Sequence, residues 1–169
     1  MTVHSESTVL AAVDVAVSYG DFEALTASSF SVDAGELIAV VGPNGAGKST
    51  LFKALAGFID HDGDVVVHGE QCHHLERQAI AYIPQQSDVD LRFPITVAEV
   101  VMAGRRRFHG ARMRPSRGDH EHVADCLKQV DLADMGSRSL ATLSGGQVQR
   151  VLLARALAQE ADVLLLDEA

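Results

Sequence analysis

A glycine-rich run at positions 42–50 has the spacing of a phosphate-binding loop. Its glycines let consecutive backbone N–H groups curl inward toward phosphate oxygens, and the positive end of the following helix adds its dipole. Lys48 supplies a charge for the β- and γ-phosphates, and the Ser49 hydroxyl is placed to bind Mg²⁺. The predicted nucleotide contacts are Gly42, Pro43, Asn44, Gly45, Ala46, Gly47, Lys48, Ser49 and Thr50.

A second anion site and a carboxylate pair follow later in the chain. Ser144 and the glycines after it open a helix, so backbone N–H groups and the helix dipole face outward. Asp167 and Glu168 end an apolar strand. Such a pair can hold Mg²⁺ through water and polarise an attacking water, although two acids that end a strand are, taken alone, more often a solvated edge. The sequence contains no Asn-Lys-x-Asp guanine reader, which argues against a GTPase.

Strands and one helix must position these groups. The apolar run Leu37–Val41 is typical of a strand buried on both faces, and it leads directly into the glycine-rich loop. Helical spacing of Leu51, Leu55 and Phe58 predicts a helix after the loop, with Gly57 as its stop. The other predicted strands are Leu10–Val17, Phe30–Val32, Val65–His68, Ala79–Ile83 and Asp162–Leu166.

The middle of the chain is predicted to be helical. Thr96 and Glu99 have capping-box spacing and start one helix, and a second is expected near His120–Val130. Ser144 and Gln147 form another capping box, which opens a helix that runs to Gln159. The segment from about 96 to 140 is therefore expected to be a helical insertion in an α/β chain.

Composition limits the class of protein. The chain has 169 residues, 47% of them hydrophobic, and a net charge of −9, which fits one soluble globular domain and argues against nucleic acid as a partner. No apolar run approaches the roughly 20 residues that cross a bilayer, and Met1–Leu10 has no basic segment followed by an apolar stretch, so we expect neither a membrane span nor a secretory signal. The six arginines of 105–117 are expected on a solvated or partner-facing surface. Two cysteines, Cys72 and Cys126, suggest a reducing cytosol.

The string Leu143-Ser144-Gly145-Gly146-Gln147 resembles the signature motif of ABC ATPases, and Val163–Glu168 resembles the Walker B strand of the same family. The resemblance implies an α/β P-loop NTPase (RecA-like) core, with an N-terminal antiparallel β subdomain and a helical signature subdomain. It also implies a head-to-tail homodimer in which Ser144, Gly145, Gly146 and Gln147 of one subunit close on ATP held by the other.

Two shorter motifs fit this resemblance. Tyr82-Ile83-Pro84-Gln85 is similar to the family's Q-loop, in which Gln85 would reach Mg²⁺ or the γ-phosphate side; the adjacent Gln86 is the less favoured candidate. Tyr19 matches the aromatic residue that stacks on adenine. By resemblance, Lys48, Gln85 and Glu168 are the catalytic residues, and Ser49, Gln85 and Asp167 hold Mg²⁺.

Longer stretches resemble the subfamily that imports manganese, zinc or chelated iron. They are Tyr82–Asp90, Phe93–Val97, Met102–Arg105 and Ala156–Asp162. This resemblance implies transmembrane permease subunits, indirectly a solute-binding protein, and a peripheral position at the cytoplasmic face of the membrane. Cargo selection would lie in those other subunits.

The chain is expected to be a single ABC ATPase domain that is incomplete at its C-terminus. Its parts would be the β subdomain and loop core (1–95), the helical subdomain (96–142), and the signature helix with the Walker B strand (143–169). Family members continue into another strand and a switch histidine, whereas the last histidine here is His122. The missing strand would lie between the strand before the phosphate loop, Leu37–Val41, and the Walker B strand, which would leave two facing strand edges unpaired. We therefore expect either that the sequence is part of a longer protein or that the chain has low stability and little hydrolysis.

Other functions remain as alternatives. The first is a non-transport ABC ATPase in DNA repair or translation; those that act on chromosomes carry long coiled coils, and this chain has no sustained heptads. A non-catalytic nucleotide-binding remnant is the second alternative. Metal sites at Cys72-His73-His74, or at Asp119, His120, His122 and Cys126, are disfavoured because neither group has four ligands at an established spacing.

Overall fold

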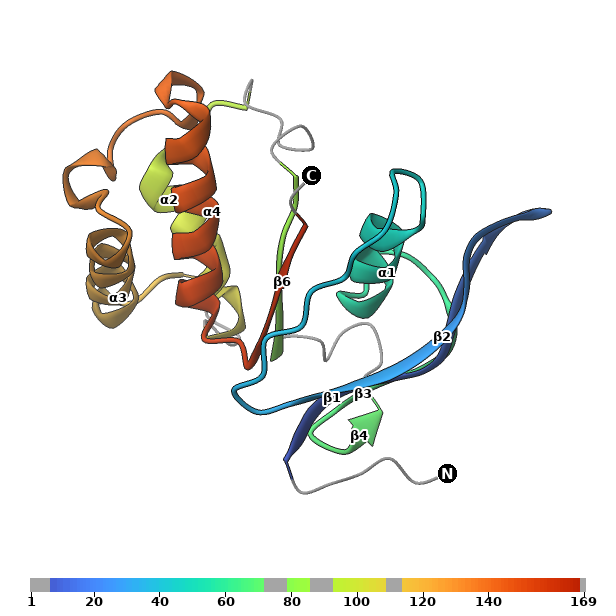
Figure 1. Cartoon of the computed structure of the whole chain (residues 1–169). Coiled ribbons are helices and arrows are strands. Elements are labelled where there is room, and N and C mark those ends of the chain that lie inside the picture. Colours follow the sequence, from blue (N-terminus) through green and yellow to red (C-terminus); the bar gives the residue numbers. More distant parts are fainter. Residues whose placement is uncertain (1–6, 72–78, 86–92, 109–113, 168–169) are drawn as a thin grey trace. The chain divides into compact units, whose positions relative to one another are not determined.

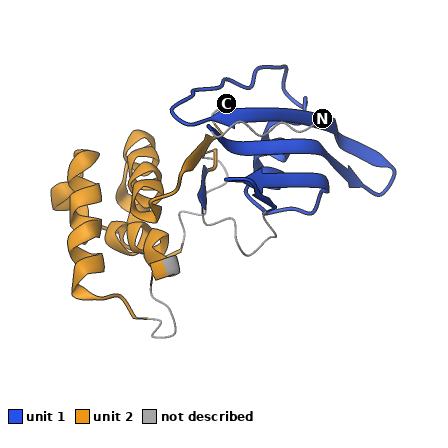
Figure 2. Ribbon diagram, turned by 90° about the horizontal axis from the view of Figure 1, so that it is seen from below, with its two compact units in different colours: residues 1–82 blue, residues 83–169 orange. Residues whose placement is uncertain are grey.

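A computed structural model describes residues 7–71, 79–85, 93–108 and 114–167 of the chain. The chain divides into two compact units, residues 1–82 and 83–169, which are coloured separately in Figure 2. The first unit contains an antiparallel sheet, the glycine-rich loop and one helix. The second is mostly helical.

The sheet of the first unit has the strand order β2-β1-β3-β4 (Figure 1), with every neighbouring pair antiparallel. Its strands are β1 (Thr8–Tyr19), β2 (Phe22–Asp33), β3 (Asp62–Val67) and β4 (Glu70–Gln71). Leu10, Val15 and Val17 of β1 are fully buried, because apolar side chains of this strand gather on the core face. The predicted antiparallel β subdomain is thus confirmed.

One irregularity interrupts β1 at Asp14. This residue has a φ of 50°, and the register of β1 against both neighbouring strands shifts around it. The Ser29 hydroxyl donates to the Asp14 carboxylate at 2.9 Å, and the Asp14 N–H donates to the Ser29 Oγ at 2.8 Å. Gly63 approaches so closely that a Cβ on it would lie 2.3 Å from the Asp14 carbonyl oxygen. The bulge therefore requires glycine at that position of β3.

Helix α1 (Lys48–Leu55) follows the glycine-rich loop and packs on β1 and β2. It buries Leu51, Ala54 and Leu55, two of which were in the predicted apolar repeat. Gly57 has a φ of 76°, and its N–H donates to the Ala54 carbonyl at 3.0 Å, so it ends the helix as predicted. Phe58 lies beyond that end, and its ring stands 5.5 Å from the ring of Tyr82.

The prediction of a buried strand at Leu37–Val41 is wrong for this structure. No strand among the described residues pairs with this run, and its side chains are exposed, with Leu37 94% and Val41 87% accessible. A strand that is buried on both faces needs hydrogen-bonding neighbours on both edges. Without such a ladder the apolar run remains an extended connection from β2 to the loop.

The second unit is built around helix α4 (Gly145–Gln159), against which α2 (Val97–Ala103) and α3 (Arg117–Gln129) both pack (Figure 1). Short 3₁₀ turns connect them: η3 (Gly104–Phe108), η5 (Ala133–Met135) and η6 (Leu140–Thr142). Val148 and Val151 of α4 are completely buried, as are Val97 and Val101 of α2. The three predicted helices and both predicted capping boxes are present.

Two short strands complete the described chain: β5 (Ile80–Ile83) and β6 (Val163–Leu166). These two strands are neighbours in one sheet, and the N–H of Asp167, the residue after β6, donates to the carbonyl of Ile83, the last residue of β5, at 3.0 Å. Both strands were predicted from their apolar runs. Within the described residues no helix is long and apolar enough to cross a membrane; the longest, α4, has 15 residues.

The prediction that all the arginines of 105–117 lie on the surface is wrong for Arg105. Its side chain is only 12% accessible, and its guanidinium bonds to Asp119 at 3.1 Å and to Glu160 at 2.9 Å. The same group lies 3.7 Å from the centre of the Phe108 ring. Arg105 therefore joins η3, α3 and the end of α4. By contrast, Arg106, Arg114 and Arg117 are exposed, as expected.

The described residues offer no group of three or more His, Cys, Asp or Glu side chains that could hold a metal ion. Of the weaker candidate set, Asp119 is bonded to Ser116 and Arg105, and Cys126 is buried in the helical core. Burial raises the pKa of the Cys126 thiol, which disfavours the thiolate that binds metals. The other set, Cys72-His73-His74, lies outside the described residues.

Acid should weaken the helical unit through Asp119. Hydrogen bonds from the Ser116 hydroxyl and backbone N–H, with a smaller contribution from Arg105, hold the pKa of Asp119 well below its usual range. A lowered pKa in the folded state gives stability that is fully present above the unfolded value of about 3.9 and is lost as the pH falls below it. We expect the urea midpoint to fall between pH 5 and pH 3.

Asp119→Asn should flatten this acid dependence, since asparagine does not titrate. Asp134→Asn, which changes an exposed carboxylate on η5, is the matched control and should keep the steep acid limb. An equal fall of the urea midpoint between pH 5 and pH 3 in the two variants would contradict the assignment to Asp119. The measurement is urea unfolding followed by far-ultraviolet circular dichroism at each pH.

Candidate nucleotide-binding site

The glycine-rich loop makes a tight turn and then bends before α1. Gly45 and Gly47 have φ angles of 83° and 87°, values that side chains other than glycine rarely adopt. Gly47 also lies against β2, where a Cβ on it would stand 2.8 Å from the Ala24 carbonyl oxygen. The local backbone therefore requires glycine at both positions. At Gly45 the reason is the φ angle alone, and at Gly47 it is the φ angle together with the lack of space for a side chain.

The backbone of the loop holds the side chain of Lys48 in place. The ammonium group donates to the carbonyl oxygens of Gly42, at 2.8 Å, and Pro43, at 2.9 Å. A lysine ammonium has three donors, so this geometry fixes the charge at the loop and leaves one donor for a further acceptor. The arrangement suits a phosphate oxygen placed beside the loop.

The start of α1 adds backbone donors to this charge. Lys48 is the first residue of the helix, followed by Ser49 and Thr50, and the first turn contains no acidic residue. The N–H groups of a helix's first turn have no partners within the helix, and its N-terminus is the positive end of the dipole. The loop and helix together form a concentrated positive region suited to phosphate.

Tyr19 lies at the tip of the β1–β2 hairpin, opposite Phe22, with its side chain 57% exposed. The end of the loop contacts β2 at Ala24 and Leu25, only two to three residues from that tip. The first unit therefore places an exposed aromatic ring and the phosphate loop on the same strand pair. A flat ring in this position can stack on a nucleotide base.

Gln85 and Asp167 are brought close in the second unit. Gln85 follows β5 by two residues, and the Asp167 N–H is bonded to Ile83, the last residue of β5. The Asp167 side chain is only 4% exposed. A carboxylate and an amide oxygen at one strand edge are oxygen ligands of the kind that Mg²⁺ prefers. Glu168 and Gln86 lie outside the described residues.

The signature residues begin α4. Ser144 is the N-cap residue in an extended conformation, and Gly145 and Gly146 form the first turn. A Cβ on Gly146 would meet no atom within 4 Å, so the space beside this glycine is open. The Ser144 N–H donates to the Gln147 side-chain oxygen at 2.9 Å, and the Gln147 amide nitrogen donates to the Met135 sulfur at 3.6 Å. Open space and free helix-start donors make this a second place where an anion fits.

The predicted site residues thus fall into separate groups within each unit. Loop, helix start and Tyr19 belong to the first unit. Gln85, Asp167 and the signature belong to the second, in which the signature begins α4 and Asp167 follows the strand after it. In the second unit, α4 positions the signature residues at its start, and β6, the strand that follows it, positions Asp167.

Sequence reasoning missed two contacts of the helical unit. The Asp119 carboxylate accepts from both the hydroxyl and the backbone N–H of Ser116, and the spacing Ser116-x-x-Asp119 is itself a capping-box signal that could have revealed it. The contact between Met135 and Gln147 has no such signal, because it depends on how the η5 turn folds back toward α4.

Residues 25–169 match the family model described as "ABC transporter". The chain is 41% identical over 152 residues to a manganese transport system ATP-binding protein of Listeria monocytogenes, covering 90% of this chain and 63% of that protein. It is 44% identical over 158 residues to a chelated iron transport system membrane protein of Yersinia pestis, covering 92% of this chain and 53% of that protein.

A solved structure gives the same result at the level of the fold. The ADP conformation of an ATP-binding cassette of an ABC transporter superposes with a TM-score of 0.76 at 25% identity, covering 93% of this chain and 67% of that one. The fold is that of a P-loop nucleoside triphosphatase. The chain belongs to the ABC transporter family. It spans less than two thirds of the length of the curated relatives described above.

Proposed function

We propose that this chain is the ATP-binding and ATP-hydrolysing part of a subunit that powers an ABC importer. The observation that carries the proposal is the phosphate loop, in which the Lys48 ammonium is fixed over the carbonyl oxygens of Gly42 and Pro43 at the start of α1. That geometry presents a cation, helix-start donors and loop N–H groups to one ligand. A triphosphate carries enough charge to use all of them.

Each group of residues has a distinct part in the proposed reaction. Lys48 and the loop N–H groups bind the β- and γ-phosphates, and Tyr19 stacks on the adenine. Glu168 accepts a proton from the attacking water and orients it. Gln85 stands near Asp167 after β5 and contacts the γ-phosphate side of the site. The loop is thus proposed to bind the nucleotide, and Gln85 and Glu168 are proposed to act on its terminal phosphate.

The residues proposed for Mg²⁺ fit that ion. Ser49 offers a hydroxyl in the first turn of α1, Gln85 an amide oxygen and Asp167 a carboxylate, so the donor set is entirely oxygen. When bound, Mg²⁺ neutralises charge that develops on the phosphate oxygens. The chain's role is to hold the Ser49 hydroxyl at the start of α1 and the Asp167 carboxylate after β6.

A second copy of the chain completes the proposed site. Ser144, Gly145, Gly146 and Gln147 present the open start of α4, and we propose that this surface closes on the γ-phosphate of ATP bound by the other copy. The cargo is proposed to be manganese or chelated iron, because the relatives named above carry those words in their names. Permease subunits and a solute-binding protein would select the cargo, with this subunit peripheral at the cytoplasmic face.

ATP-driven dimerisation tests the proposal. Glu168→Gln should bind ATP without hydrolysing it and form a stable dimer, which sedimentation velocity detects as a doubled mass. Adding Gly146→Ala to this variant should abolish the dimer, because a methyl group would fill the space proposed for the γ-phosphate while meeting no atom of its own chain. Thermal stability should not fall, since alanine is favoured over glycine in a helix by about 1 kcal/mol.

Two results would count against this function. A Glu168→Gln chain that binds ATP yet stays monomeric at every ATP concentration would refute closure by the signature surface. A Gly146→Ala variant that dimerises as well as its parent would show that the open space at α4 is not used. Gly118→Ala, in the first turn of α3, is the control for a glycine outside the proposed interface.

A further inference from the structure

Both ends of the Gln147 side-chain amide are engaged. Its oxygen accepts from the Ser144 N–H at 2.9 Å, and its nitrogen donates to the Met135 sulfur at 3.6 Å. The last torsion of a glutamine side chain is broad, so one bond alone leaves the amide plane free to swing. The pair of bonds fixes the plane and leaves one amide hydrogen for another acceptor.

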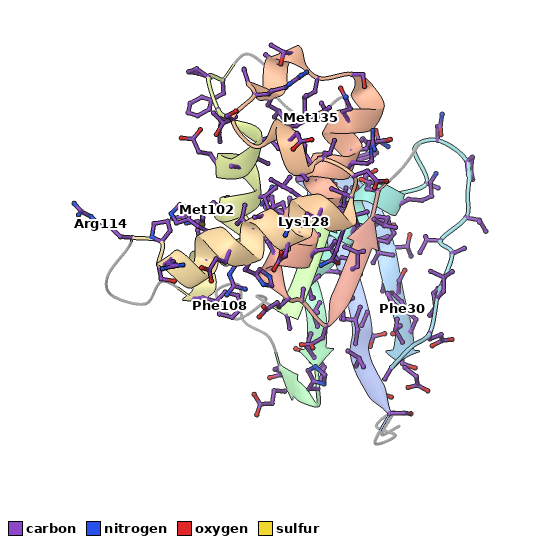
Figure 3. All side chains as sticks on the ribbon, turned by 90° about the vertical axis from the view of Figure 1, so that its left-hand side faces the viewer. Phe30, Met102, Phe108, Arg114, Lys128 and Met135 are labelled. Carbon is purple, nitrogen blue, oxygen red and sulfur yellow. The ribbon has the colours of Figure 1, made fainter. Side chains whose placement is uncertain are left out.

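Met135 lies on a turn that other parts of the unit hold in place (Figure 3). Its N–H donates to the Leu132 carbonyl at 3.0 Å, and its carbonyl accepts from the Arg138 N–H at 2.9 Å. The turn is then bonded to the start of α2, because the N–H groups of Ala98 and Val97 donate to the carbonyls of Gly136 and Arg138. The position of the sulfur is therefore set by α2 as well as by the helix that it contacts.

Methionine suits this position because it combines an apolar side chain with a weak acceptor. The side chain is partly buried and lies before α4 on a turn whose next residue, Gly136, packs near Leu127 and Ala98. A leucine would fill similar space but could not accept from the Gln147 amide. A glutamine would have similar length and offer a carbonyl oxygen as a stronger acceptor.

We propose that Met135 is a positioning residue for the signature: its sulfur holds the Gln147 amide against the N-terminus of α4. In this orientation Gln147 covers the Ser144 N–H and leaves the backbone N–H groups of Gly145 and Gly146 to face the nucleotide. The inference rests on the proposed function, because it assigns a role in the surface that closes on ATP. Met135 itself contacts no nucleotide.

The test compares three methionine variants in the Glu168→Gln chain. Met135→Leu should raise the ATP concentration for half-maximal dimerisation about fivefold, the effect of one net hydrogen bond. Met135→Gln should bring it back to within about twofold of the parent. Met102→Leu, on α2 (Figure 3), is the matched control and should change nothing. Binding of a fluorescent ATP analogue to the monomer should be equal in all of them.

A second set of variants, made in a Gln147→Ala chain, distinguishes positioning of the Gln147 amide by Met135 from a general effect of Met135 on the fold. In a Gln147→Ala chain, Met135→Leu should cause no further change in dimerisation, since the partner of the sulfur is gone. A further loss in that background, or a Met135→Leu variant equal to its parent, would overturn the proposal. So would failure of Met135→Gln to restore dimerisation while its thermal stability equals that of the parent.

Nuclear magnetic resonance keeps the inference testable if the parent chain does not dimerise with ATP, a result that would refute the proposed function alone. The Gln147 side-chain N–H resonances should shift in Met135→Leu and stay in place in Met102→Leu. Unchanged Gln147 resonances in Met135→Leu would overturn the positioning role.

Discussion

Lys48→Ala should weaken nucleotide binding by the chain at least about tenfold. The ammonium group is fixed over the loop by two carbonyl oxygens, and its loss removes both the cation and the bonds that hold the loop closed around it. A hydrogen bond to a charged group contributes about 1.5–3 kcal/mol, so the dissociation constant should rise at least about tenfold. Fluorescence titration with an ATP analogue measures this change.

Lys53→Ala is the matched control for charge. Lys53 lies in the last turn of the same helix, away from the loop, and its loss changes the net charge by the same amount. The control should bind the analogue with nearly the affinity of the unmodified chain. Equal weakening in both variants would mean that net charge, and not the fixed ammonium, attracts the nucleotide.

Gly104→Ala should destabilise the helical unit more than other glycine substitutions in its helices. A Cβ at this position would lie 2.3 Å from the Arg155 carbonyl oxygen and 3.2 Å from the Ala158 Cβ, where η3 crosses the last turn of α4. Overpacking of this kind costs about 1–3 kcal/mol. We expect a loss near the upper end of that range, because the obstacle is backbone and cannot rotate away.

Urea unfolding measures the Gly104→Ala effect, and Gly118→Ala provides the comparison. At Gly118 a Cβ would meet only the Ser116 hydroxyl oxygen, at an ordinary 3.7 Å, so that variant should be as stable as the parent or slightly more so. Nothing in the backbone angle forbids alanine at 104, where φ is −63°. An unaffected Gly104→Ala chain would therefore mean that η3 and α4 are not so tightly packed in solution.

Local patterns predicted the helical unit well. The capping box at Thr96 and Glu99 starts α2 where expected, because both bonds of the box form between residues three apart. The signature string also predicted the start of α4, since its serine and glutamine cap the helix that its glycines begin. Such signals depend only on residues a few positions apart, so they do not require the rest of the chain to fold in a particular way.

Two predictions that depended on distant partners failed. The residues of Leu37–Val41 suit a buried strand, but composition alone does not supply the neighbouring strands that would pair with them. The arginine run indicated a solvated or partner-facing surface, yet the Arg105 side chain is largely shielded, because Asp119 of α3 and Glu160 at the end of α4 bind its guanidinium. For the site, sequence spacing predicted the loop and signature, whereas the sulfur contact to Gln147 required the folded turn.

The exposed run Leu37–Val41 has a consequence for the behaviour of the chain at high concentration. It is a five-residue stretch without charge or proline, rich in β-branched residues, and its backbone is unpaired in the described structure. Such stretches are templates for intermolecular β-pairing and aggregation. Because the run continues directly into Gly42, pairing with another chain would pull on the phosphate loop itself. We therefore expect aggregation through these five residues to lower the nucleotide affinity as well.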